Sequence, residues 1–245
     1  FILYEEQVYV IEVNPRSSRT IPYISKVTGV PVIDLATRVL LGEKLRNLDY
    51  GVGLYPEASY FAVKMPVFSF EKLRGVDTGL GPEMKSTGEC LGIAESFSQA
   101  LLKAFKGVGM KTPKKGARVI VTVRDEDKAD IVELAKMMVN MGIEILATAG
   151  TCAALTAAGI PAKSVSRVSQ SSPNILDEIA SGHIDLVIDT PTRGKKRGTD
   201  GFLIRRTAVE HAVACVTSLD TARALLTAAE QGRSVDLQAI DITKN

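Results

Sequence analysis

The sequence predicts an α/β protein whose second half is built on a parallel sheet. After residue 117, short apolar strands alternate with helices that carry one apolar face, which is typical of a parallel sheet covered on both sides. Before that point strands and helices mix without regular alternation, which indicates an α+β first part. The segment KGVGMKTPKKG, at residues 106–116, has no apolar period and separates the two patterns. We therefore expect two domains, residues 1–115 and 116–245.

The elements of the first half follow from local patterns. A β-branched alternating run before Asn14-Pro15 predicts a strand with a hairpin partner ahead of it. Pro31 and Gly42 bracket a helical pattern. We expect strands over 1–4, 8–13 and 60–68, helices over 31–41 and 93–105, and an ordered loop over 75–92. The apolar face expected for the first of these helices consists of Ile33, Ala36, Val39 and Leu40.

The second half alternates regularly. Its first helix shows the clearest apolar face, formed by Ile131, Leu134, Ala135 and Met138. We expect strands over 119–123, 143–147, 184–188 and 215–216, and helices over 125–141, 150–158, 173–180, 202–212 and 221–230.

Composition excludes several classes of protein. The 245 residues are 45% hydrophobic and 24% charged, with a formal net charge of +2. Such values argue against disordered, collagen-like and disulfide-scaffold proteins, and the balanced charge argues against nucleic acid as a partner. No apolar run approaches the roughly 20 residues of a bilayer span, so no membrane partner is expected. The three cysteines lie far apart, which predicts reduced thiols and a cytoplasmic location.

A first polar cluster follows the strand expected at residues 8–13. Glu12 and Asn14 are two residues apart and would point to the same side of a strand, where a carboxylate and an amide oxygen suit a hard cation such as Mg²⁺. Arg16 and Arg19 come next, and guanidinium groups match phosphate oxygens. The cluster predicts a metal–phosphate site. A charged strand end with surface ion pairs remains the alternative.

A second cluster opens the helix expected at residues 150–158. Thr148 and Thr151 bring hydroxyls to a helix N-terminus, whose free amides and dipole favour an anion. Lys128, after the preceding strand of this half, can reach the same carboxyl edge of the sheet, where open parallel sheets bind ligands. The alternative is that one of the threonines serves only as a helix N-cap.

A third cluster is strongly basic. Arg193, Lys195, Lys196 and Arg197 place four cations within six residues. A solvated surface loop is one interpretation and a clamp for a polyanionic ligand is another. RNA binding ranks third because no aromatic platform accompanies the charges.

Two long motifs carry a resemblance to a known family. IEVNPRSSRTIPYISKVTG at residues 11–29 and GVDTGLGPEMKSTGE at residues 75–89 resemble motifs of the carbamoyl phosphate synthase large chain, in the same order and spacing. The resemblance continues to residue 245. It implies the C-terminal portion of an ATP-grasp domain followed by a regulatory domain similar to methylglyoxal synthase. Since Phe1 enters an expected hairpin directly, we expect this chain to be a piece of a longer protein.

The resemblance implies an ATP-dependent ligase that phosphorylates carbamate to carbamoyl phosphate. Residues matching Glu12 and Asn14 hold Mg²⁺ or Mn²⁺, and those matching Arg16 and Arg19 face the transferred phosphoryl group. K⁺ is a further candidate ion and ATP is the substrate. The implied partners are the upstream remainder of the large chain and a glutaminase small subunit, in an oligomer of heterodimers. The adenine pocket would lie upstream, so we expect no turnover from these residues alone.

For the regulatory part, the resemblance implies that Lys128, Thr148 and Thr151 bind the phosphate of a nucleotide effector such as UMP or IMP. Arg167 stands where some members have Lys, and Asp189 stands where Asn is expected, which adds a negative charge that costs ~1 kcal/mol in a wet site. Phosphoribosyl pyrophosphate is the candidate for the basic loop.

Two other functions are alternatives. The first is a non-catalytic regulatory module that binds nucleotide or phosphoribosyl pyrophosphate. The second is a lyase similar to methylglyoxal synthase, which the absence of a GGD-type loop argues against.

Overall fold

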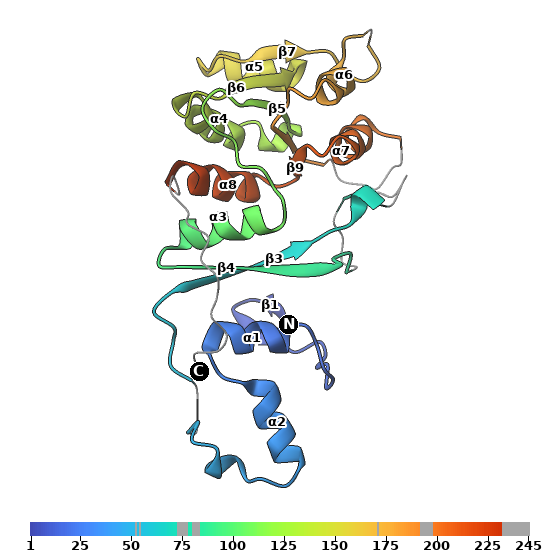
Figure 1. Cartoon of the computed structure of the whole chain (residues 1–245). Coiled ribbons are helices and arrows are strands. Elements are labelled where there is room, and N and C mark those ends of the chain that lie inside the picture. Colours follow the sequence, from blue (N-terminus) through green and yellow to red (C-terminus); the bar gives the residue numbers. More distant parts are fainter. Residues whose placement is uncertain are drawn as a thin grey trace. The chain divides into compact units, whose positions relative to one another are not determined.

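The structure, a computed structural model, describes residues 1–51, 53, 55–72, 78–79, 84–170, 172–191 and 198–231 (Figure 1). Its internal contacts define two compact units, one containing residues 1–59 and the other residues 60–239. The sequence pattern predicts a domain boundary between residues 115 and 116. That boundary differs from the division into compact units and stays a prediction. No helix in the described part of the chain is long and apolar enough to span a membrane.

The first unit begins with the expected hairpin. Strands β1 (Ile2–Tyr4) and β2 (Gln7–Tyr9) pair antiparallel, and Glu5 and Glu6 make the turn with positive φ angles of 47° and 61°. The second strand was expected to continue to residue 13 and this is wrong. The register pairs Ile2 with Tyr9, so the residues after Tyr9 lie beyond the end of the partner strand.

Two helices follow in this unit. Helix α2 (Val32–Leu40) is confirmed, whereas α1 (Thr20–Thr28) was not expected from the sequence. The apolar face predicted for α2 is also wrong, since Leu35 is its one buried residue and Leu40 is 87% exposed. A short 3₁₀ turn lies at Leu45–Asn47.

The second unit contains an antiparallel pair and a helix before the parallel sheet. Strand β3 (Phe61–Val67) is confirmed, and it pairs with β4 (Gly88–Ala94) in part of the segment expected to be a loop. Helix α3 (Phe97–Gly107) therefore begins later than expected, after Ser96 caps it by accepting a hydrogen bond from the Gln99 amide. A 3₁₀ turn occupies Phe70–Lys72.

The parallel sheet has the order β7-β6-β5-β8-β9 (Figure 1). Every pair of neighbouring strands is parallel, as the sequence predicts. The strands are β5 (Arg118–Thr122), β6 (Glu144–Thr148), β7 (Lys163–Val165), β8 (Leu186–Asp189) and β9 (Ala214–Val216). The helices are α4 (Asp130–Asn140), α5 (Ala149–Ala157), α6 (Ile175–Ala180), α7 (Asp200–Glu210) and α8 (Leu219–Gln231). All of these were expected except β7, with ends shifted by a few residues.

The sheet is covered on both faces, because successive residues of its central strand enter different cores. Val119 and Val121 pack in a core with residues from α3, α4, α5 and α8. Ile120, between them, packs in a second core with Ile175 of α6 and Ile204 of α7. The strand is thus apolar at every position, which explains why its pattern was legible in the sequence.

Candidate functional site

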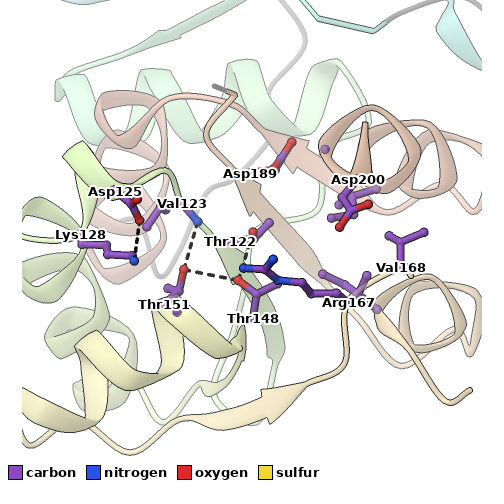
Figure 2. A pocket seen from close by; sticks show the side chains of 14 residues that line it. Thr122, Val123, Asp125, Lys128, Thr148, Thr151, Arg167, Val168, Asp189 and Asp200 are labelled. Atoms are coloured by element: carbon purple, nitrogen blue, oxygen red, sulfur yellow. Dashed lines mark hydrogen bonds and ion pairs between the residues drawn. The ribbon is translucent and has the colours of Figure 1, made fainter. Parts of the chain in front are cut away.

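A cavity of about 200 Å³ lies where the central strands of the parallel sheet end (Figure 2). In the sheet, β5 has β6 on one side and β8 on the other, and the chain reverses its direction of strand addition there. Such a switch point leaves a crevice at the carboxyl edge. The cavity is lined by Thr122, Val123, Asp125, Lys128, Thr148, Gly150, Thr151, Arg167, Val168, Ile175, Asp189, Asp200, Gly201 and Ile204. All five predicted effector-binding residues are in this set.

Two cations line the cavity. Lys128 ends a 3₁₀ turn at Asp125–Asp127 and is not inside the helix, which begins only at Asp130 and not at residue 125 as expected. Its Nζ lies 2.6 Å from Asp125 Oδ1, and this hydrogen-bonded cation lowers the pKa of the Asp125 carboxyl. Arg167 follows β7, and Figure 2 shows its side chain extending into the pocket toward Thr148.

Three threonine hydroxyls form a chain at the ends of β5 and β6. Thr148 Oγ1 lies 3.3 Å from Thr122 Oγ1 and 3.5 Å from Thr151 Oγ1 (Figure 2). Thr151 Oγ1 also accepts a hydrogen bond of 3.3 Å from the Val123 amide, so this hydroxyl joins the two strand ends. A hydroxyl can donate as well as accept, which lets such a chain turn its protons toward a bound anion.

The N-terminus of α5 opens onto the same cavity. Thr148 occupies the N-cap position, but its side chain makes no capping hydrogen bond. The first amides of the helix have no partner within the helix, so they can receive an anion. At Gly150 an added Cβ would lie 3.2 Å from Lys128 Nζ, which shows how closely the ammonium approaches this backbone.

The opposite wall is acidic and buried. Asp189, at the end of β8, is 4% exposed, and Arg205 of α7 donates a hydrogen bond to its Oδ2. Burial raises the pKa of Asp189, and Arg205 opposes that shift. The negative charge expected at Asp189 is thus paired with Arg205, and its cost to a bound phosphate stays a prediction. Nearby, burial and the charge of Asp189 raise the pKa of the Cys215 thiol to about 12.

The first predicted cluster lies in the other compact unit and is not on a strand. Asn14 Nδ2 donates to Glu12 Oε1 at 3.4 Å, and Arg16 donates to Asn14 Oδ1 at 3.4 Å. These side chains are exposed, as is Arg19, which occupies the N-cap position of α1 without a capping side-chain hydrogen bond. Glu12 and Asn14 are thus close together, as expected. They are joined by a local hydrogen bond in an irregular segment and not by the alternation of a strand.

A divalent cation would find a partial set of donors at this cluster. The Glu12 carboxylate and the Asn14 amide are adjacent and exposed, but the amide turns its nitrogen to Glu12 while its oxygen accepts from Arg16. A carboxylate and an amide oxygen match the chemistry that Mg²⁺ and Mn²⁺ accept when phosphates or water supply the remaining ligands, so Asn14 would have to turn its oxygen toward a bound ion. Among the described residues there is no group of three or more His, Cys, Asp or Glu side chains that could hold a metal. Glu12 and Asn14 therefore fit one part of a metal site.

The third predicted cluster lies outside the described residues. It comprises Arg193, Lys195, Lys196 and Arg197.

Sequence reasoning missed several residues of the cavity wall. Thr122 ends β5 at the same edge as Thr148 ends β6, so the rule that ligands bind at the carboxyl edge could have found it. No comparable sequence pattern marks Asp125 or Asp200 as a residue of the cavity wall. Arg205 and Arg206 are both ion-paired, with Asp189 and Glu210 respectively.

Two parts of the chain match family models, and the whole chain is similar to known proteins. A family model described as "Carbamoyl-phosphate synthase L chain, ATP binding domain" matches residues 1–48, and one described as "MGS-like domain" matches residues 130–217. The chain is 55% identical over 244 residues to the carbamoyl phosphate synthase large chain of Lachnoclostridium phytofermentans, which covers 100% of this chain. It is 53% identical to that of Agathobacter rectalis, with 98% of this chain covered. This chain is a relative of the carbamoyl phosphate synthase large chain.

The resemblance seen in the sequence is therefore confirmed over the full length. The chain spans 23% of the length of these two large chains. Among solved structures, a methylglyoxal synthase from Elizabethkingia anophelis NUHP1 aligns with a TM-score of 0.39 and 20% identity, over 48% of this chain and 81% of that one. The α/β class is established by the five-stranded parallel sheet and the match to the MGS-like family model.

Proposed function

We propose that this chain is the C-terminal part of a carbamoyl phosphate synthase large chain. In the whole protein, an ATP-dependent ligase, ATP would phosphorylate carbamate to carbamoyl phosphate for arginine or pyrimidine synthesis. Full-length similarity to curated large chains supports this proposal more than it supports an isolated regulatory module. The proposed partners are the upstream part of the large chain and a glutaminase small subunit, assembled as an oligomer of heterodimers in the cytoplasm.

The catalytic contribution proposed for this chain comes from its first unit. Glu12 and Asn14 would supply two oxygens to a Mg²⁺ or Mn²⁺ ion, which neutralises charge on the phosphates of ATP, and K⁺ remains a further candidate ion. Arg16 and Arg19 would hold the transferred phosphoryl group with charge-assisted hydrogen bonds. The match of residues 1–48 to the ATP-binding family model supports this assignment.

We further propose that the cavity of the second unit binds the phosphate of a nucleotide effector, UMP or IMP. One observation carries the proposal: Lys128, Thr148, Thr151 and Arg167 come from three separate segments and line a single cavity at the switch point of the sheet. The cavity also includes the uncapped N-terminus of α5. Two cations, free amides and rotatable hydroxyls are the donors that a phosphate dianion requires.

Calorimetric titration at fixed moderate salt tests this site. UMP, IMP and phosphoribosyl pyrophosphate are titrated into the wild-type chain, into Lys128→Ala and into Lys136→Ala. Lys136 is the matched control, because it also pairs with an acid three residues earlier but does not line the cavity. We expect saturable binding of a nucleotide that Lys128→Ala weakens about 10- to 100-fold, the size of a lost charge-assisted hydrogen bond, and that Lys136→Ala leaves unchanged.

Two results would speak against the effector site. Equal binding by the two variants would show that Lys128 does not contact the ligand, and no binding by the wild-type chain would reject the site in this chain. A separate assay of ADP release tests the catalytic proposal, in which we expect no turnover from these 245 residues alone and recovery only with the upstream part and glutaminase subunit.

A further inference from the structure

The carboxylate of Asp189 would repel a phosphate group bound in this pocket. Asp189 ends β8, lines the cavity and is 4% exposed, so its charge is close to any ligand and poorly screened by water. The cavity is also lined by Asp125 and Asp200, against the two cations Lys128 and Arg167. Among the described residues that line the pocket, the acids outnumber the bases unless a residue outside this lining compensates them.

The compensation comes from beneath the cavity wall. Arg205, on α7, is 8% exposed and donates to Asp189 Oδ2. It does not itself line the cavity, whereas Gly201, one turn earlier on the helix, does. A Cβ added to Gly201 would lie 3.0 Å from Arg205 Nη1 and 3.4 Å from Asp189 Oδ2. The bare backbone of Gly201 therefore packs directly over the ion pair and allows it to sit this close to the cavity.

The pair is poorly built for stabilising the fold. Arg205 Nε is buried and has no hydrogen-bond partner among the described residues. A buried donor without an acceptor is unfavourable, and buried ion pairs in general barely repay their loss of hydration. A role in ligand binding accounts for the pair better than a role in stability does.

We propose that Arg205 is a positioning residue that neutralises Asp189 and so allows this cavity to bind the phosphate group of a nucleotide. Arg205 acts through Asp189 and does not touch the ligand. The inference rests on the proposed effector function of the cavity and adds to it the residue that sets the charge of its acidic wall. It follows that Arg205 is needed for binding only while residue 189 carries a negative charge.

A double-mutant cycle on the full 245-residue chain tests this dependence. UMP affinity is measured by calorimetry for the wild type, Arg205→Met, Asp189→Asn and the double variant. We expect Arg205→Met to weaken binding about 10- to 100-fold, because it leaves a bare carboxylate near the phosphate. Adding Asp189→Asn should restore affinity to within about threefold of the Asp189→Asn single variant.

Arg206→Met is the matched control on the same helix. Arg206 is also buried and ion-paired, but its partner Glu210 does not line the cavity, whereas Asp189 does. Its loss should leave UMP affinity within about twofold of wild type. If Arg205→Met does not fold, the UMP affinities of the double variant and of Asp189→Asn are compared instead. Arg205→Lys keeps the positive charge and should retain binding.

The remaining outcomes overturn either the inference or the proposed function on which it rests. If the double variant binds much more weakly than Asp189→Asn, Arg205 contacts the ligand or holds the fold and the inference is wrong. If Arg205→Met folds and binds as wild type does, the inference is also wrong. If the wild-type chain binds no nucleotide, the proposed function of the cavity fails and the inference falls with it.

Discussion

The ammonium of Lys128 lies 2.6 Å from the carboxylate of Asp125 at the mouth of the cavity. The Asp125 side chain is 91% exposed, whereas that of Lys128 is 31% exposed. A phosphate that enters the cavity must therefore either share the Lys128 ammonium with the Asp125 carboxylate or displace that carboxylate from it. Exposed ion pairs of this kind are weak, so the exchange is inexpensive.

Replacing Asp125 by Asn should strengthen nucleotide binding. The change removes both the competitor for Lys128 and a negative charge near the phosphate, and we expect a gain of about two- to fivefold. Calorimetry with UMP measures it, with Glu133→Gln as the control because Glu133 holds Lys136 at 2.9 Å in the same spacing outside the cavity. Weaker binding by Asp125→Asn would mean that the carboxylate orients the lysine.

Replacing Gly92 by Ala should destabilise the second unit. Its added Cβ would lie 2.1 Å from the Ala100 carbonyl oxygen and 2.7 Å from the Ala104 nitrogen, both backbone atoms of α3. Strand and helix must separate to admit it, at a cost of about 1–3 kcal/mol. Urea unfolding monitored by circular dichroism measures the change. Gly88→Ala, in the same strand and in ordinary contact with Val67, should shift the midpoint little.

Cys215 should be inert to thiol reagents in the folded chain. The residue is half-buried, but the surroundings of its thiol raise the pKa to about 12, so the reactive thiolate is scarce at pH 8. Labelling followed by peptide mass spectrometry should show Cys215 modified only as fast as the chain unfolds. Rapid modification under native conditions, at the rate seen in denaturant, would contradict this.

Asp177 should make α6 sensitive to acid. Its Oδ2 accepts hydrogen bonds from the Asn174 amide and the Ser172 hydroxyl, and these lower its pKa from the ordinary 3.8. A carboxyl whose pKa is lowered by folding contributes stability above its unfolded pKa and loses it as the pH falls through the folded one. Asp177→Asn should therefore be less stable than wild type at pH 7, and the difference should shrink below pH 3.8.

Thermal unfolding across a pH series measures this difference. Asp130→Asn is the control, because Asp130 also lies in the first turn of a helix but makes no side-chain hydrogen bond within the described structure. A gap between Asp177→Asn and wild type that stays constant from pH 7 to pH 2 would show that the carboxylate charge does not matter.

The parallel sheet could be predicted because its strands are buried on both faces. Continuous apolar runs such as that around Ile120 cannot be mistaken for surface segments. The missed elements lack this signal. The β7 strand is a polar edge segment with two of its three residues exposed, and α1 buries no residue at all. In β4, Gly88 and Gly92 suggested a loop, whereas Gly92 is there because α3 approaches its backbone.

The site was predictable where it depends on strand ends. Lys128, Thr148 and Thr151 follow the first two strands of the sheet, and parallel strands bring their carboxyl ends to one edge. The pairing of Asp189 with Arg205 was not predictable, because it joins residues 16 positions apart through the packing of α7 against the sheet. The sequence alone therefore did not show that the charge of Asp189 is paired.

The most direct test of the account is a two-dimensional amide spectrum of the labelled chain titrated with UMP. The account predicts that the amides of Gly150 and Thr151, at the N-terminus of α5, shift with saturation, because they receive the phosphate. Gly182, beyond the end of α6 and outside the cavity, should not shift. Saturable binding that leaves Gly150 and Thr151 unmoved while other amides shift would place the nucleotide elsewhere and contradict the account.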